Sequence, residues 1–595
     1  MIRVADFIIN QLYQNGVKNI YTVSGRGALF LTDAIAKHKL INNIAMHHEQ
    51  SAAFAAIAES QYTNNISACL VSTGCASTNT ITGLLCAWQD NIPCVFISGQ
   101  NILKETSNYT GLNIRTYGQQ EANIIPIVKS ITKYAVMIKK PEDILVELDR
   151  ALNEAISGRP GPVWIDIPLD IQSALIENKN IDIQEILVRN KPKFPDKNDL
   201  LQICNTIRKS KRPLVLIGSG IRSSNSESQL INFIEKNRIP LVYSNSSPDI
   251  YGSCNELSIG SVGSMGASRS GNFALQNCDF LLVIGNRLNS YLTGLDFCKF
   301  AREAFVCVVD IDEIEHKKES VRIDKFLQAD ANFFLRKINE ITFNLEINDW
   351  VQTCLNWKNM FSQLEPEFCS SDKIDLYQLS KQLSENLPEC SSLVTDSGFI
   401  EVILPTNVIF KSGQRCIHPV SQGSMGFALP AAIGVYLSSK KHTIAVIGDG
   451  SIMMNIQELQ TISHNKLPIK IIVINNNVYG IIRRRQIDLF RNRTIGTDNT
   501  NGVSCPSFLK VANAFDLDYQ KIDNINELEA GLKKLMETNS PTICEIFCRE
   551  DQSYIEIGVT KNNNNKFVRR PLEDQIPFLD RDLFLNQMII KPIDQ

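Results

Sequence analysis

Residues 443–450 read TIAVIGDG and residues 469–477 read IKIIVINNN, and these two stretches decide the fold. Each is a continuous apolar run that ends in glycine, aspartate or asparagine. Unbroken apolar strands of this kind are buried on both faces, as in parallel sheets that helices cover on both sides. The segment between the two runs has helical character. The two stretches therefore predict a strand–helix–strand unit of an α/β fold.

The same alternation of apolar strands and helical segments continues along most of the 595 residues. Apolar strands are predicted at residues 67–73, 93–100, 213–220, 280–287, 305–312, 443–450 and 469–477. At about 100–200 residues per domain, a chain of this length has three or four domains. We therefore predict an α/β protein with three doubly wound parallel-sheet domains.

Two polar, weakly patterned segments divide the chain. Residues 176–198 are predicted to be a linker, and residues 343–373 are predicted to hold a helix around Trp350–Gln363 and then a second linker. The predicted domains and tail are residues 1–175, 195–340, 374–550 and 551–595. Apolar residues in the tail predict that it docks on the body of the protein.

Composition and charge exclude several classes of protein. A net charge of −3 offers no attraction for nucleic acid or an anionic membrane. The N-terminal residues MIRVADFIINQLYQNG have the period of an amphipathic helix, not the pattern of a signal peptide, and no run of about 18 apolar residues occurs. The 16 cysteines form no CxxC pair, which favours reduced thiols. We expect a cytoplasmic protein that binds neither nucleic acid nor membrane.

The GDGS turn at 448–451, together with the asparagines after the next strand, predicts a site for a metal and a diphosphate. Neighbouring parallel strands end at one edge of a sheet, so Asp449 and Asn476 are expected to face one point there. Their oxygens suit Mg²⁺, which prefers oxygen ligands and phosphates. Gly448 and Gly450 let the backbone approach a diphosphate, and the following helix points its N-terminus at it. A tight turn beside an asparagine-rich loop is the alternative.

With this spacing, the motif resembles that of enzymes that use thiamine diphosphate (ThDP), and in particular the acetolactate (acetohydroxyacid) synthases. The resemblance implies an N-terminal pyrimidine-binding domain, a central dinucleotide-fold domain and a C-terminal diphosphate-binding domain. It implies that Asp449, Asn476 and the Val478 carbonyl hold Mg²⁺. The residues implied to bind ThDP are Gly25, Asn79, Gly423, Met425, Gly448, Asp449, Gly450, Ser451, Asn476, Tyr479 and Gly480.

Other stretches carry the same resemblance. They are HEQ (48–50), STGCASTN (72–79), GQQEAN (118–123), SGRPGPVWIDIP (157–168) and GSMGFALP (423–430). In the family, the HEQ glutamate hydrogen-bonds the cofactor's pyrimidine nitrogen and so promotes loss of the proton from the reactive carbon. The resemblance therefore implies that Glu49 is catalytic and that Gln120 lies in the active site. A helix N-terminal acid, favoured by the helix dipole, is the alternative for Glu49.

The family also implies an assembly and a second cofactor. Its glutamate domain meets the diphosphate domain of another subunit, so we expect a homodimer or homotetramer. Its central domain holds FAD, and the matching positions are Gly218, Ser219, Gly220, Gly263, Gly285, Arg287, Asp310 and Asp330. A dinucleotide fold without a bound flavin is the alternative.

Three positions in the substrate region depart from the family. Leu169 stands where the family has lysine, Tyr291 aligns with its arginine, and Arg485 aligns with its tryptophan. Loss of the lysine and the arginine removes charge partners for a small anionic acceptor. Arg26, Ile481 and Arg485 are the candidates for the substrate pocket. The arginines at 483–485 form either a phosphate site or a solvated helix face.

The resemblance implies a ThDP carboligase that decarboxylates a 2-oxo acid, with pyruvate as the expected donor. The acyl unit then passes to an acceptor carbonyl. The departures, with the tail sequence RRPLEDQIPFLDRDLF, resemble synthase-like proteins of surface-polysaccharide pathways, some of which transfer an acetyl unit to a nucleotide-linked ketosugar. A true acetolactate synthase, a simple 2-oxo acid decarboxylase and a non-catalytic scaffold are the alternatives.

Overall fold

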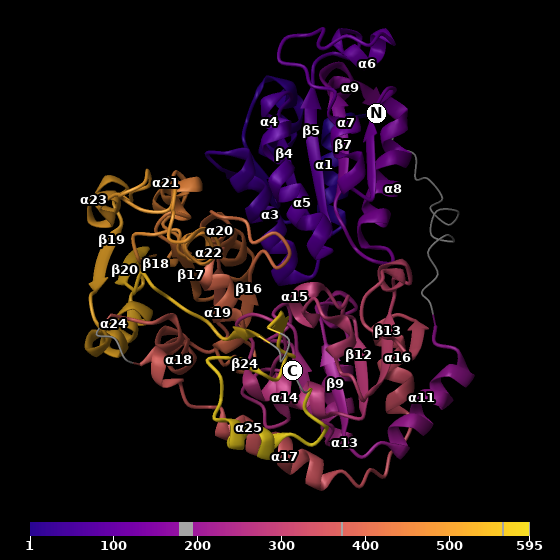
Figure 1. Ribbon diagram of the computed structural model, residues 1–595. Coiled ribbons are helices and arrows are strands. Elements are labelled where there is room, and N and C mark those ends of the chain that lie inside the picture. The colour runs from indigo at the N-terminus through magenta and orange to yellow at the C-terminus, as the bar shows by residue number, and fades with distance from the viewer. Residues whose placement is uncertain (178–193, 370–372, 562–564, 594–595) are drawn as a thin grey trace.

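The computed structural model describes residues 1–177, 194–369, 373–561 and 565–593. Three six-stranded parallel sheets, each flanked by helices, form three bodies in Figure 1, at the top, left and lower right. The predicted α/β fold of three doubly wound parallel-sheet domains is confirmed. All seven predicted apolar strands are present, and the predicted N-terminal helix is α1 (Val4–Gln14).

The N-terminal sheet has the strand order β3-β2-β4-β5-β7-β6. Its strands are β2 (Asn19–Thr22), β3 (Asn42–Ala45), β4 (Ser67–Val71), β5 (Cys94–Gln100), β6 (Tyr134–Met137) and β7 (Val163–Pro168). Its helices after α1 are α2 (Leu29–Lys37), α3 (Glu49–Thr63), α4 (Cys75–Asn79), α5 (Ile81–Asp90), α6 (Ser107–Thr110), α7 (Ile124–Val128), α8 (Ile144–Ile156) and α9 (Leu169–Ser173). A short antiparallel pair, β1 (Ile2–Arg3) with β8 (Leu175–Ile176), joins the two ends of this domain.

The C-terminal sheet repeats this topology. Its order β16-β15-β17-β18-β20-β19 places the second, first, third, fourth, sixth and fifth strands side by side, as in the N-terminal sheet. The strands are β15 (Ser392–Thr395), β16 (Arg415–Ile417), β17 (Thr443–Gly448), β18 (Lys470–Asn475), β19 (Asp518–Ile522) and β20 (Thr542–Phe547). The helices are α18 (Leu376–Asn386), α19 (Phe399–Asn407), α20 (Ala428–Ser439), α21 (Glu458–His464), α22 (Gly480–Phe490), α23 (Phe508–Ala514) and α24 (Ile525–Glu537).

The central sheet has the different order β11-β10-β9-β12-β13-β14. Its strands are β9 (Pro213–Ile217), β10 (Leu241–Tyr243), β11 (Ser258–Ser261), β12 (Phe280–Ile284), β13 (Phe305–Asp310) and β14 (Lys325–Gln328). Its helices are α11 (Lys197–Lys209), α12 (Gly220–Ser223), α13 (Glu227–Asn237), α14 (Arg269–Asn277), α15 (Ser290–Thr293), α16 (Ala331–Asn339) and α17 (Asn348–Met360).

The central domain extends beyond the predicted boundary at residue 340. Trp350 and Trp357 on α17 are buried in the same apolar core as the central strands. These two large aromatic side chains face the sheet, so α17 belongs to the domain rather than to a linker. Most of the predicted first linker, residues 178–193, lies outside the described residues.

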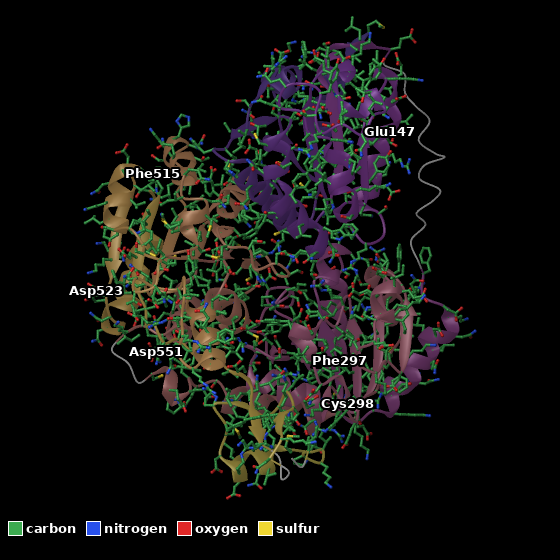
Figure 2. All side chains as sticks on the ribbon, turned by 45° about the horizontal axis from the view of Figure 1, so that its top comes forward. Glu147, Phe297, Cys298, Phe515, Asp523 and Asp551 are labelled. Carbon is green, nitrogen blue, oxygen red and sulfur yellow. The ribbon has the colours of Figure 1, made fainter. Side chains whose placement is uncertain are left out.

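The tail crosses from the C-terminal domain to the central domain. It contains β21 (Glu556–Ile557), β22 (Val559–Lys561), β23 (Phe567–Arg569), β24 (Gln575–Ile576) and α25 (Arg581–Gln587). Leu572 and Phe584 join the central core, which confirms that the tail docks. In Figures 1 and 2 the yellow tail lies along the lower edge of the molecule, and α25 lies beside α17 in Figure 1.

The N-terminal and C-terminal domains pack through two small-residue helices. The alanines of α3 and the buried face of α20 share one apolar core. A Cβ on Gly434 of α20 would overlap the Ala55 carbonyl oxygen, so a glycine is needed for this close approach. This contact sets the position of α3, and therefore of Glu49, relative to the C-terminal domain.

Candidate active site

Asp449 ties together the ends of two neighbouring strands. It follows β17, and its Oδ2 accepts hydrogen bonds from the backbone N–H groups of Asn476 (3.1 Å) and Asn477 (2.7 Å), which follow β18. Its Oδ1 accepts from the N–H of Gly450 (2.7 Å). Burial raises the pKa of Asp449, and these N–H groups act against that shift. The Val478 N–H donates to Asn476 Oδ1 (3.3 Å), so the loop after β18 is held in place.

A cavity of about 550 Å³ opens at this edge of the sheet. It is lined by the cofactor and metal residues predicted from the C-terminal domain: Gly423, Met425, Gly448, Asp449, Gly450, Ser451, Asn476, Val478, Tyr479 and Gly480. Ile481, which was predicted for the substrate pocket, lines it as well. The volume lies within the about 300–1,000 Å³ typical of cofactor and small-molecule sites.

The walls of the cavity suit an anion and a divalent cation. The first turns of α19 and α22 both line it, so two helix N-termini with free N–H groups border the same space. A Cβ on Gly450 would overlap the ring of Tyr479, which explains glycine in the GDG turn. The carboxylate of Asp449 and the amide oxygen of Asn476 are hard oxygen donors. These residues therefore fit a diphosphate with Mg²⁺.

Asp396, at the end of β15, is a residue of this site that the sequence analysis missed. It is fully buried, and its Oδ1 accepts from Ser451 Oγ (2.5 Å) and the N–H of Gly426 (3.2 Å). Its Oδ2 accepts from the N–H of Ala428 (2.8 Å). Asp396 thus joins the GDGS turn to the turn before α20. The signal was present, because VTDSG has the same pattern of an apolar strand ending in aspartate and glycine.

The residues predicted from the N-terminal domain form a second group. Asn79 Nδ2 donates to Glu49 Oε2 (3.0 Å) at the start of α3, and the Gln120 carbonyl lies against Gly74. Arg26 donates to the side chain of Gln119 (3.2 Å).

The two groups do not share one cavity in a single chain. Gly25 lies beside Ser72 at the carboxyl edge of the N-terminal sheet, near Arg26. Among the described residues that line the cavity of Asp449, none comes from the N-terminal domain. The cavity of one chain therefore lacks Glu49.

A second cavity, of about 170 Å³, lies where the N-terminal, central and C-terminal domains meet. It is lined by all but one of the predicted flavin residues: Gly218, Ser219, Gly220, Gly285, Arg287, Asp310 and Asp330. Gly263 is the exception, and it lies against the Tyr291 carbonyl oxygen instead. A glycine turn and carboxylates at strand ends are residues that typically bind a dinucleotide. The volume of the cavity, however, is smaller than that of typical ligand sites, which begin at about 300 Å³.

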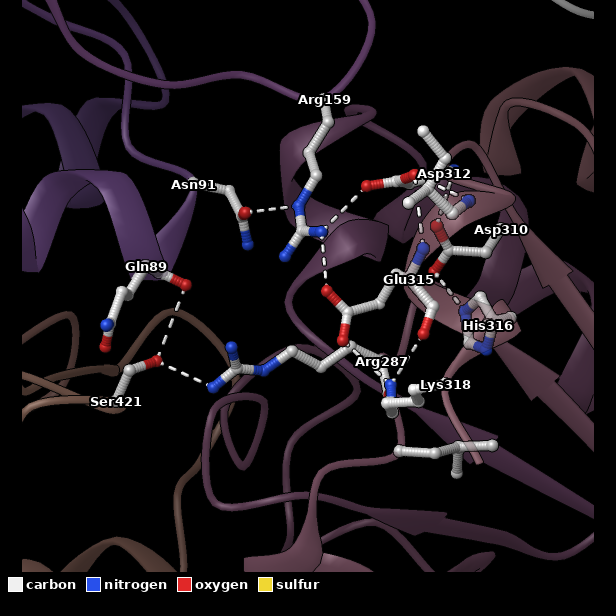
Figure 3. Close-up of polar contacts among 12 residues, drawn as sticks. Gln89, Asn91, Arg159, Arg287, Asp310, Asp312, Glu315, His316, Lys318 and Ser421 are labelled. Carbon is white, nitrogen blue, oxygen red and sulfur yellow. Dashed lines mark hydrogen bonds and ion pairs between the residues drawn. The ribbon is translucent and has the colours of Figure 1, made fainter. Parts of the chain in front are cut away.

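Arg159 and Glu315 line this second cavity and belong to a network of polar contacts, which Figure 3 shows. Arg159 Nη1 contacts both Asp312 and Glu315 at 2.8 Å, and its Nε donates to Asn91. Arg287 donates to Ser421 Oγ (2.9 Å) across the boundary with the C-terminal domain.

The arginines at 483–485 are already paired. Arg483 contacts Asp498 and Glu550, while Arg484 contacts Glu556 and packs over the ring of Tyr554. Arg485 is 50 % exposed, donates to the Tyr554 hydroxyl and does not line the cavity. Of the three substrate-pocket candidates, only Ile481 lines it. Carboxylates in the tail and in neighbouring loops therefore already neutralise the cluster that was considered for phosphate.

The fold and site together define a class of protein: an α/β protein with a cavity, at the carboxyl edge of its third sheet, whose lining residues suit a diphosphate and a divalent cation. Three family models match the chain. They are the N-terminal TPP binding domain (residues 2–127), the central domain (200–338) and the C-terminal TPP binding domain (396–546) of thiamine pyrophosphate enzymes. Among the described residues, no helix is long and apolar enough to cross a membrane.

Curated relatives narrow the class. The acetolactate synthase large subunit of Buchnera aphidicola subsp. Acyrthosiphon pisum is 30% identical over 540 residues, which cover 89% of this chain and 91% of the relative. The acetolactate synthase isozyme 2 large subunit of Escherichia coli (strain K12) is 29% identical over 543 residues, which cover 91% of this chain and 95% of the relative. The probable acetolactate synthase large subunit of Methanocaldococcus jannaschii is 29% identical, with coverage of 91% of each chain. The chain belongs to the thiamine-pyrophosphate enzyme family, in its acetolactate-synthase-like branch, and is a ThDP-dependent carboligase of that type.

Proposed function

We propose that this enzyme decarboxylates a 2-oxo acid, with pyruvate as the donor, and transfers the acyl unit to the carbonyl of a nucleotide-linked ketosugar. The observation that carries the proposal is the cavity at Asp449, where two helix N-termini and two oxygen ligands meet. The choice of acceptor rests on Leu169 and Tyr291, which stand where the family has lysine and arginine. Without those cations, the pocket is less suited to a second anionic 2-oxo acid.

In this proposal, Asp449, Asn476 and the Val478 carbonyl hold Mg²⁺, and the N-termini of α19 and α22 neutralise the diphosphate. ThDP, when bound, supplies a carbon nucleophile and accepts the charge left when CO₂ departs. Met425 and Ile481 present apolar groups that exclude water, and a dry pocket favours loss of the carboxylate's charge. Glu49 would hold the pyrimidine ring of ThDP by a hydrogen bond and promote loss of the proton from its reactive carbon.

We further propose that two copies complete the site, with Glu49 from one and Asp449 from the other. This is supported by the absence of N-terminal-domain residues from the described lining of the cavity. Exposed apolar side chains on both halves also support it, since such patches mark interfaces. They are Tyr109, Leu112 and Tyr117 in the N-terminal domain and Ile482, Leu489, Phe490 and Ile495 near α22.

Flavin in the second cavity and a cytoplasmic location complete the proposal. The glycine turn at 218–220 and the carboxylates of Asp310 and Asp330 would hold the dinucleotide. Because the cavity is small, side chains of its lining would have to shift for the flavin to enter. Absorbance near the flavin bands in the purified protein, released on denaturation, tests this; a colourless protein that takes up no FAD rejects it.

The alternative of a true acetolactate synthase is favoured by the names of the relatives, all three of which are acetolactate synthase large subunits. The two functions share every step up to loss of CO₂ and differ only in the acceptor. Products therefore have to be identified directly, with pyruvate alone and with pyruvate plus a nucleotide-linked ketosugar.

The test follows CO₂ release from pyruvate in the presence of ThDP and Mg²⁺. We compare the wild type with Glu49→Gln and with Glu142→Gln, an exposed glutamate of the same domain. Release that is lost in Glu49→Gln but kept in Glu142→Gln, and a branched sugar among the products, support the proposal. Acetolactate as the sole product would establish the alternative, and no release from any 2-oxo acid would reject both.

Mixing variants tests the shared site. Glu49→Gln and Asp449→Asn chains, each inactive alone, are mixed in equal amounts and allowed to exchange. If the site is shared between two chains of a symmetric dimer, about a quarter of the wild-type sites are intact after exchange. If each chain carried its own complete site, mixing would restore nothing.

A further inference from the structure

Gln120, a predicted active-site residue of the N-terminal domain, has a backbone conformation that is uncommon for a residue with a side chain. Its φ is 59°, in the left-handed region that favours glycine. Its side chain is exposed in the single chain and has no hydrogen-bond or ion-pair partner among the residues that the structure describes. A conformation of this kind persists only where the surrounding structure holds it, and it is found most often at functional sites.

The buried side chain of Gln100, the last residue of β5, ties the turn that contains Gln120 to the sheet. Its Nε2 donates to the carbonyl oxygen of Ala122 (3.0 Å) and to Asp166 Oδ2 (3.3 Å) in β7. Its Oε1 accepts from Thr73 Oγ1 (2.6 Å) and from the next backbone N–H (3.0 Å). Because a backbone N–H can only donate, the amide oxygen has to face it, and the NH₂ group has to face the two acceptors. Every donor and acceptor position of this amide is therefore occupied.

Asn101 holds the other side of the same turn. Its side chain is buried, and its Nδ2 donates to the carbonyl oxygen of Gln119 (2.9 Å). A Cβ on Gly118 would overlap this Nδ2, so the turn lies directly against the amide. The carbonyl oxygen of Gln120 in turn occupies the space that a Cβ on Gly74 would take. Two amides at the end of one strand thus hold the backbone before and after Gln120.

Glu121 braces the turn from within. Its Oε1 accepts from the N–H (2.5 Å) and the Oγ (2.6 Å) of Ser107, and its Oε2 accepts from the N–H of Tyr117 (2.8 Å). The side chain of Gln120 takes no part in this network. A firmly held backbone that carries a free, exposed side chain is the arrangement of a preorganised site residue.

The network continues into the core of the N-terminal sheet. The strands β4, β5 and β7 lie side by side (Figure 1), so side chains near their carboxyl ends meet. Asp166 is fully buried, and its Oδ1 accepts from Ser98 Oγ (2.6 Å), which in turn accepts from Trp164 Nε1 (2.9 Å). Burial raises the pKa of Asp166 to about 7, and the charge of Glu121 adds to that shift. Asp166 and Glu121 are thus titratable groups that act on the amide of Gln100.

We propose that Gln100 and Asn101 are positioning residues: their amides hold the turn at residues 117–122 so that Gln120 is presented to the site shared by two copies. This deepens the proposed function and rests on it, since the place of Gln120 in that site follows from the family resemblance. Without either amide, the turn relaxes toward a common backbone conformation and the side chain of Gln120 moves. A displacement of about 1 Å at a positioned group lowers the rate by up to about a hundredfold.

The first experiment replaces each amide by an acid of the same shape. Gln100→Glu and Asn101→Asp each lose the NH₂ group that faces a carbonyl oxygen. Gln14→Glu and Asn15→Asp, at the exposed end of α1, are the matched controls, and the second of them also loses an amide-to-carbonyl hydrogen bond (2.9 Å). CO₂ release is measured at saturating pyruvate, ThDP and Mg²⁺, well below the melting temperature of each variant. Each positioning variant is expected to lower kcat by about tenfold to a hundredfold, and the controls are expected to stay within about twofold of the wild type.

The second experiment uses the acid that Gln100→Glu places beside Asp166. At pH 8 two carboxylates face each other there, and neither can donate. As the pH falls, the pair takes up a proton, and one oxygen can donate again. The loss of kcat relative to the wild type is therefore expected to shrink several-fold between pH 8 and pH 6. Gln100→Met has no donor at any pH and is expected to keep its loss.

Hydrogen exchange reads the turn without turnover. Peptides that cover residues 117–123 are expected to exchange faster in Gln100→Glu and Asn101→Asp than in the wild type, while peptides of α1 are expected to stay unchanged. Because both amides act on the same turn, one of the two variants suffices if the other does not fold.

The outcomes separate the two proposals. If the wild type releases no CO₂ from pyruvate, the proposed function fails and this inference falls with it. If CO₂ is released and depends on Glu49, but the positioning variants keep kcat within about twofold, the two amides only stabilise the fold and this inference alone is overturned. Unchanged hydrogen exchange at residues 117–123, or a loss in Gln100→Glu that is the same at pH 6 and pH 8, also overturns it.

Discussion

Replacing Asp396 by asparagine removes one hydrogen bond from the centre of the diphosphate domain. The Asp396 carboxylate accepts four donors: Oδ1 takes the N–H groups of Ser397 (2.7 Å) and Gly426 (3.2 Å) and the Ser451 hydroxyl (2.5 Å), and Oδ2 takes the N–H of Ala428 (2.8 Å). An asparagine has one acceptor oxygen. If that oxygen takes the three-donor position, the amide NH₂ faces the Ala428 N–H, and a buried donor loses its partner.

The loss amounts to about 2 kcal/mol, the middle of the range of about 1–3 kcal/mol for an unsatisfied buried donor. For a cooperative unit of about 150–250 residues, this lowers the melting temperature by about 4–8 °C. Differential scanning calorimetry at one fixed scan rate measures the shift, because a protein of three domains need not unfold reversibly.

Ser451→Ala is the comparison for Asp396→Asn. It removes the hydroxyl, but the Gly426 N–H keeps its second acceptor, Asp396 Oδ1. We therefore expect a smaller shift, about half that of Asp396→Asn. A shift under 1 °C for Asp396→Asn, or a larger one for Ser451→Ala, would refute the assignment of Asp396 as the group that joins these turns.

Three further changes have defined consequences. Gly450→Ala places a Cβ on the ring of Tyr479, and such overpacking costs about 1–3 kcal/mol. The affinity for ThDP, measured by fluorescence titration, should therefore fall about tenfold. An unchanged affinity would contradict the role of the GDG turn in binding the diphosphate. Burial lowers the pKa of His418 to about 4, below its unfolded value, so the unfolded chain takes up the proton first as the pH falls. The free energy of unfolding should drop by about 2 kcal/mol from pH 7 to pH 5. In thermal unfolding measured over the same pH range, His418→Gln should lack this part of the decrease. Arg159→Gln breaks the ion pairs with Asp312 and Glu315 and should lower the melting temperature by several degrees. Arg159→Lys should recover only part of this, because lysine has no second nitrogen to donate to Asn91; full recovery would show that charge alone suffices.

The sequence predicted the sheets and the diphosphate half of the site because both depend on local patterns. Continuous apolar strands such as 443–448 show burial on both faces directly, and Asp449 and Asn476 follow two such strands. A residue that ends a strand of a parallel sheet lies at the carboxyl edge of that sheet, whichever residues surround it. The motif was therefore readable without the fold.

Features that depend on distant partners could not be read in this way. Trp350 and Trp357 looked like part of a helix before a linker, but their burial depends on which sheet they face. The sequence allowed Arg484 to bind phosphate, but in the structure Glu556 of the tail forms an ion pair with it.

Arg287 is part of the lining of both cavities, together with its partner Ser421. A ligand that contacts this guanidinium in one space would therefore act on a side chain of the other. A ligand that pulls the guanidinium toward one side changes the free energy of binding on the other, and linkage requires the effect to be equal in both directions. A flavin without a redox role would then still have a use: as an effector that adjusts how tightly the carbon–carbon bond-forming site holds its contents.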